Sequence, residues 1–145
     1  MECMFENCNF SNSLLEGTGL KDVTFINCKI IGVDFSKCNP FLLKMKFQDC
    51  LLDLSIFQGM KLKDTVFEKC RLREADFGNA DLSGALFRDC DLTGAVFEYT
   101  NLRKVDFRSA SGYRIDPEVN QLAGARFSAS GLAGLLGKYG ILVED

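Results

Sequence analysis

Residues 80–97, ADLSGALFRDCDLTGAVF, carry a large apolar side chain at every fifth position: Leu82, Phe87, Leu92 and Phe97. An α-helix repeats every 3.6 residues and a strand every two, so a continuous helix or strand would scatter these side chains over several faces. The period of five instead predicts a short extended segment followed by a turn in each unit. Four such units would close a square coil of about twenty residues.

The same period runs through most of the chain. Its first members are Phe5, Phe10, Leu15, Leu20, Phe25, Ile30 and Phe35. Two extra residues follow at Asn39-Pro40, and the series then resumes at Leu42 and reaches Phe107, with Phe and Leu alternating from Phe47 onward. Small or thin residues lie two positions before each of these large apolar residues, so each unit offers two inward and three outward side chains. Stacked coils, about 4.8 Å apart, would then align two columns of Phe and two of Leu.

The units ADLSG, CDLTG, TNLRK and ADFGN resemble those of the pentapeptide-repeat family, whose unit is approximately A(D/N)LXX. The resemblance covers residues 3–107 and implies an all-β fold, a right-handed quadrilateral β-helix. We expect this β-helix over residues 1–127, with a bulge at 39–40 and an irregular corner at 108–121. Because Phe5 is already in register, the first coil lacks cover, and we expect either a longer protein or a mis-assigned start.

Residues 128–145, SASGLAGLLGKYGILVED, have the pattern of a short capping helix followed by a strand. Apolar residues recur at i, i+3, i+4 and i+7, Ser128 or Ser130 can cap the start, and Gly140 can cap the end. Gly131, Gly134 and Gly137 indicate helix packing, because the strand and lysine of a phosphate-binding loop are missing.

The order DP, partial coil, helix, GILV resembles the C-terminus of Qnr-type quinolone-resistance proteins. That resemblance implies a homodimer formed through this end. The candidate interface residues are Leu132, Leu135, Leu136, Tyr139 and the predicted strand residues Ile141, Leu142 and Val143.

Cysteine makes up seven of the 145 residues, which raises the question of a metal site or disulfides. Five of the seven lie two positions before the apolar residue of a single side, which we name the thiol side: Cys8, Cys28, Cys50, Cys70 and Cys90. This spacing predicts a buried and unreactive thiol ladder, with neither disulfides nor a metal.

Charges differ between the two sides that follow the thiol side along the chain. The acidic side carries Glu16, Asp34, Asp76 and Glu98 outward against Lys37. The basic side carries Lys21, Lys44, Lys61, Lys63, Arg103 and Lys104 against Asp22, Asp64 and Asp81. An acidic stripe is compatible with the DNA mimicry that the Qnr resemblance implies, in which the rod occupies the DNA-binding saddle of DNA gyrase or topoisomerase IV. The basic side contradicts it, and a solvated surface of mixed charge is the open alternative.

Composition excludes several function classes. The chain has no histidine, so Ser-His-Asp, Cys-His and His-based metal sites are impossible. A net charge of −3 argues against direct nucleic-acid binding, and no apolar stretch approaches the length of a membrane span. We expect a cytoplasmic, non-enzymatic protein without cofactor or metal. Its hypothetical role is protein binding along the rod, with a type II topoisomerase as target, or alternatively that of a structural spacer or dimerisation module.

Overall fold

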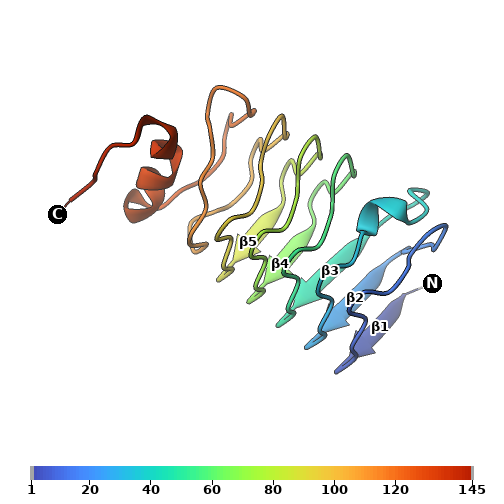
Figure 1. Cartoon of the computed structure of the whole chain (residues 1–145). Helices are drawn as coiled ribbons and strands as arrows, with labels where there is room; N and C mark the ends of the chain where they lie inside the picture. The colour runs from blue at the N-terminus through green and yellow to red at the C-terminus, as the bar shows by residue number, and fades with distance from the viewer. Residues whose placement is uncertain (1, 145) are drawn as a thin grey trace.

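The computed structural model describes residues 2–144, which form a parallel β-solenoid with a cap at its C-terminal end (Figure 1). One side, which we name the strand side, is a five-stranded parallel sheet in sequence order. Its strands are β1 (Cys3–Glu6), β2 (Val23–Ile26), β3 (Met45–Gln48), β4 (Val66–Glu68) and β5 (Leu86–Arg88). Isolated parallel bridges join successive coils on the other three sides, for example Leu51 to Arg71, Ile56 to Asp76 and Asp81 to Asn101. The predicted all-β quadrilateral coil is confirmed.

Aromatic columns fill the interior as the alternation of Phe and Leu predicts. The rings of Phe67 and Phe87 stack with centroids 5.0 Å apart on the strand side, and those of Phe57 and Phe77 do so on the acidic side. The two columns meet edge to face, with Phe67 and Phe77 at 5.9 Å and 84°. Both geometries are favourable for aromatic pairs. Leu72, between the columns, is fully buried, so one continuous core runs along the rod.

Hydrogen bonds at the corners explain why Asp or Asn precedes the inward apolar residue. Asp81 Oδ1 accepts a hydrogen bond from the backbone N–H of Ser83 at 3.0 Å, and Asp91 Oδ1 accepts one from Thr93 at 3.0 Å. Such a side chain satisfies a backbone donor that the turn leaves free. The D/N of the repeat is therefore a structural requirement of the corner.

The second residue after each inward side chain often has a left-handed backbone conformation. Within residues 2–144, fourteen non-glycine residues have positive φ, and most of them are Asn or Asp, which tolerate it best. Leu54 is an unfavourable member of this set, with φ of 61° and an exposed side chain.

Replacing Leu54→Asn should stabilise the protein by about 1 kcal/mol, because asparagine relieves the left-handed strain at a side chain that is 52% exposed. Urea unfolding monitored by circular dichroism measures the change. Leu14→Asn is the matched control, since Leu14 is also exposed but has no positive φ. An equal gain in both variants would contradict the explanation.

The bulge differs from the prediction. Asn39 pairs with Gly19, twenty residues earlier (39 − 19), whereas Met45 pairs with Val23, twenty-two residues earlier (45 − 23). The insertion therefore lies after Asn39.

Leu42, expected to point inward, is 65% exposed and has the corner φ of 54°. Pro40 takes the register position of the inward residue, and Leu43 packs against the core. The apolar run Phe41-Leu42-Leu43 hides this shift in the sequence. A short 3-10 helix, η1 (Phe35–Lys37), lies just before the bulge.

The irregular corner keeps the interior filled. Gly112 and Pro117 stand where apolar residues are expected, and Tyr113 and Ile115 are buried in their place. The Tyr113 ring lies 5.4 Å from Phe107, the last Phe of the unbroken series. The described chain stays in phase beyond this corner, because Asn101 pairs with Gln121.

Two 3-10 helices, η2 (Ala129–Leu135) and η3 (Gly137–Tyr139), cover the C-terminal end of the coil (Figure 1). Ser128 caps η2 by accepting a hydrogen bond from Gly131 N at 3.2 Å, and Gly140 ends η3 with φ of 65°, as predicted. The predicted short capping helix is present, as two consecutive 3-10 segments.

Three glycines spaced by three explain the 3-10 type, because that helix has about three residues per turn. A Cβ on Gly134 would lie 2.9 Å from Tyr113 Cδ2, and one on Gly137 would lie 2.5 Å from Arg114 Nε. The glycines therefore form the face that packs on the corner, and the prediction of helix packing is confirmed.

Residues 141–144 leave the cap without regular secondary structure (Figure 1). The strand predicted over Ile141–Val143 is not formed in the described chain, because these residues have no neighbouring strand with which to pair. Within residues 2–144 no helix is long and apolar enough to cross a bilayer.

Candidate functional site

The four predicted acidic residues lie on one side of the rod, in two columns. Asp34 and Asp76 precede the inward residue, and Glu16 and Glu98 follow it. The bridges Asp34 to Ile56 and Ile56 to Asp76 show that an uncharged residue separates the two aspartates. The acidic side is thus a series of spaced charges rather than one cluster.

Two of these carboxylates already accept hydrogen bonds from backbone N–H groups. Asp34 accepts a hydrogen bond from Ser36 N at 2.9 Å, and Asp76 accepts one from Gly78 N at 2.8 Å. Glu16 and Glu98 are exposed, and neither forms a hydrogen bond or ion pair through its side chain within residues 2–144. These two glutamates are the freely available charges of the acidic side.

Two further acids, Asp116 and Glu118, extend this side at the irregular corner but are paired. Lys138 Nζ lies 3.1 Å from Asp116 and 2.5 Å from Glu118, and Tyr139 OH donates to Glu118 at 3.3 Å. The hydrogen bond from Lys138 is the main cause that lowers the pKa of Glu118. These contacts of Lys138 and Tyr139 hold η3 against the corner, so Asp116 and Glu118 stabilise the cap. The period of five did not predict that Lys138, twenty residues after Glu118, contacts these two acids.

The predicted interface residues are mostly on the surface of the cap. Leu135 is the exception, because it packs against the core. The remaining members are exposed and form an apolar surface around η2, η3 and the tail: Leu132, Leu136, Tyr139, Ile141, Leu142 and Val143. Leu142 is the most open of them, at 87%.

The thiol ladder has a hydrogen-bonding role in the wall. Cys50 Sγ donates to Phe25 O at 3.4 Å, and Cys90 Sγ donates to Phe67 O at 3.3 Å. Ser55 Oγ does the same on the acidic side, donating to Ile30 O at 2.9 Å. A small donor at this position satisfies a buried carbonyl of the preceding coil, and cysteine does so while adding apolar volume.

Burial raises the pKa of the Cys28 and Cys38 thiols, which disfavours the reactive thiolate. Because reagent access follows exposure, we expect dithionitrobenzoate in the folded protein to modify the exposed Cys3 rapidly, the half-buried Cys8 more slowly, and the five buried thiols only through unfolding. Absorbance at the thionitrobenzoate band counts the reacted thiols. In guanidinium chloride all seven should react, and rapid reaction of more than two in buffer would contradict a closed ladder.

Within residues 2–144 no three Cys, Asp or Glu side chains are placed to bind a metal ion together. The cysteines are stacked along one wall and bonded to carbonyls. The acids are spread along the outside.

Comparison with known proteins identifies the repeat. A model of the pentapeptide repeat region matches residues 1–77, and one of pentapeptide repeats in eight copies matches residues 70–108. No relative was found among the curated proteins.

Several solved structures are similar to the chain over most of its length. Full-length QnrB1, a plasmid-mediated fluoroquinolone resistance protein, is 17% identical over 97% of this chain and 99% of its own, with a TM-score of 0.27. Rfr23 from the cyanobacterium Cyanothece 51142 is 17% identical over 88% and 82%, with a TM-score of 0.37. A pentapeptide repeat protein of the Arabidopsis thaliana thylakoid lumen is 16% identical over 93% and 88%, also at 0.37.

Proposed function

This chain belongs to the pentapeptide-repeat family, and we propose that it is a non-enzymatic β-helix that binds another protein along its acidic side. The observation that carries the proposal is the pair of exposed, unpaired glutamates, Glu16 and Glu98, on a rigid wall shared with Asp34 and Asp76. A fixed row of negative charge attracts a partner with a basic surface and orients it.

The proposed partner is a type II topoisomerase, DNA gyrase or topoisomerase IV, whose DNA-binding saddle is basic. A rod with an acidic side can occupy such a saddle in place of DNA. The order of elements in the tail, which resembles that of Qnr-type proteins, supports this target.

Gyrase supercoiling assays, with and without a quinolone, test the target. The native protein should inhibit supercoiling or protect it from the drug at micromolar concentration. Reversal of both free charges, Glu16→Lys with Glu98→Lys, should weaken the effect about tenfold, as expected for two exposed ion pairs. Asp49→Lys with Asp89→Lys is the matched control on the strand side, where Lys69 already occupies the same column.

No effect of the native protein on gyrase would reject the topoisomerase target. An effect that both double variants reduce equally would reject the acidic side as the binding surface.

We also propose a homodimer through the C-terminal end, supported by the apolar surface of the cap and tail. Pairing of two tails would supply the strand partner that Ile141–Val143 lacks in the described chain.

Sedimentation equilibrium tests the dimer. The native protein should be a dimer that Ile141→Asp with Val143→Asp converts to a monomer, while Leu14→Asp, at an exposed leucine elsewhere, leaves the dimer intact. A native monomer at high concentration would reject the pairing. A stable dimer without any effect on gyrase would favour the alternative role of spacer or dimerisation module.

A further inference from the structure

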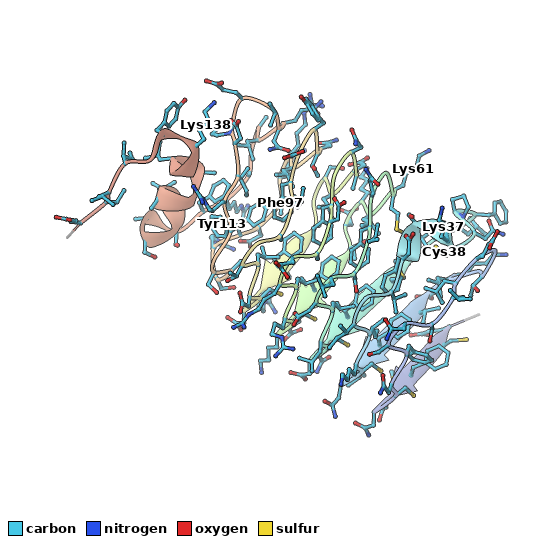
Figure 2. All side chains as sticks on the ribbon, viewed as in Figure 1. Lys37, Cys38, Lys61, Phe97, Tyr113 and Lys138 are labelled. Carbon is cyan, nitrogen blue, oxygen red and sulfur yellow. The ribbon has the colours of Figure 1, made fainter. Side chains whose placement is uncertain are left out.

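A groove of about 580 Å³ opens at the corner between the acidic side and the basic side, next to the bulge. Figure 2 shows Cys38 and Lys61 at this part of the rod, close to Lys37 of η1. The lining of the groove includes Cys38, Pro40, Phe41, Leu43, Met60 and Lys61. Its lining residues Ser36 and Gln58 lie in the same column as the free glutamates Glu16 and Glu98, and neither the period of five nor the charge pattern predicts the groove.

The groove exists because the hydrogen-bond ladder between two coils is interrupted. One coil further on, Asp81 N donates to Met60 O at 2.9 Å and Leu62 N donates to Asp81 O at 2.7 Å. Toward the bulge, by contrast, the N–H and C=O of Lys61 form no main-chain hydrogen bond within residues 2–144. Pro40 has no N–H to give, and the inserted residues carry the chain outward. Lys61 therefore presents an unpaired donor and acceptor, as the edge of a sheet does.

The floor of the groove is apolar and its rim is basic. Phe41 is 61% exposed, and Lys21 Nζ lies 4.8 Å from the centre of its ring. Lys61 lines the groove and Lys37 is adjacent in sequence to its lining, and neither they nor Lys21 form an ion pair within the described chain. Among residues 2–144, no acidic side chain lines the groove.

We propose that this groove binds an extended, acidic segment of a partner protein, with a large apolar side chain seated against Phe41, Leu43 and Met60. The backbone of the segment would pair with the free N–H and C=O of Lys61, in the manner of a strand added to an open edge. Carboxylates on either side of the apolar anchor would face Lys21, Lys37 and Lys61. The unpaired main-chain groups favour a peptide over a lipid or another ligand that lacks a backbone.

Fluorescence anisotropy with the labelled peptide EEVLFEE tests the proposal. The peptide should bind the native protein, and the charge-reversed peptide KKVLFKK should not. Lys37→Glu with Lys61→Glu should weaken binding at least about tenfold, since two rim charges are reversed. Arg103→Glu with Lys104→Glu is the matched control, because it makes the same charge change on the basic side, away from the groove. Equal loss in both double variants would show general attraction to lysine and would overturn the proposal.

A second variant closes the groove without changing its charges. Deleting Phe41 and Leu42 and replacing Pro40→Leu leaves Cys-Asn-Leu-Leu-Lys, a regular five-residue unit, before Met45. This variant should restore the ladder, raise the melting temperature and lose binding of EEVLFEE. Retained binding would overturn the proposal. Tighter binding of the chain's own tail sequence, YGILVED, together with self-association of the full chain, would assign the groove to a second copy and also overturn it.

Discussion

Leu82→Asp should unfold the β-helix or destabilise it by about 4 kcal/mol or more, which approaches the whole stability of an ordinary domain. Leu82 is fully buried within a column of leucines, with Leu62 and Leu102 at the same position in neighbouring coils. An aspartate there would place a carboxylate among apolar groups, with no basic side chain inside the wall to pair with it. Urea unfolding and far-ultraviolet circular dichroism measure the loss.

Ser83→Asp is the matched control, because it adds the same carboxylate at the next residue, which points outward. Its stability should stay within about 0.5 kcal/mol of the native protein. A Leu82→Asp variant that melts like the native protein would contradict the coil, since only an outward residue tolerates the charge.

The period of five predicted the interior almost completely because each inward side chain in a solenoid meets the same neighbours in every coil. Phe67 and Phe87 stack as the spacing requires, and the corner bonds of Asp81 and Asp91 explain the rest of the unit. Prediction failed where the local sequence offered two equal choices. Leu42 and Leu43 are both leucines, and only the positive φ of Leu42 decides which one points outward.

The candidate sites were less predictable, because they depend on which polar groups the backbone already uses. Asp34 and Asp76 look like Glu16 and Glu98 in a count of charges, yet they are bound by corner N–H groups. The groove beside Lys61 depends on a missing hydrogen bond, and the sequence signals it only through Pro40 and the two inserted residues, whose effect on the ladder is visible only in the structure. The side to which a charge belongs can thus be predicted from the repeat, whereas its availability to a partner cannot.

The C-terminal cap should detach in Gly134→Leu. A Cβ at this position would approach Tyr113 Cδ2 to 2.9 Å and Cε2 to 3.1 Å, and the buried ring has no room to move away between Phe107 and Phe127. Overpacking of this kind costs about 1–3 kcal/mol. Because the cap is held at the corner by its own contacts, including the bond from Arg114 to Gly137 O and the ion pairs of Lys138, we expect the cost to fall on this end rather than on the coil.

Hydrogen exchange distinguishes the two outcomes. In Gly134→Leu the amides of η2 and η3 should exchange freely, and trypsin should cleave at Lys138 much faster, while the amides of β2 to β5 keep their protection. Ala133→Leu adds the same side chain at an exposed neighbour and should leave the cap in place. Loss of protection throughout the rod would mean that the cap is required for the coil to fold. Unchanged protection would mean that the glycine row is not the contact that holds η2 and η3 to Tyr113 and Arg114.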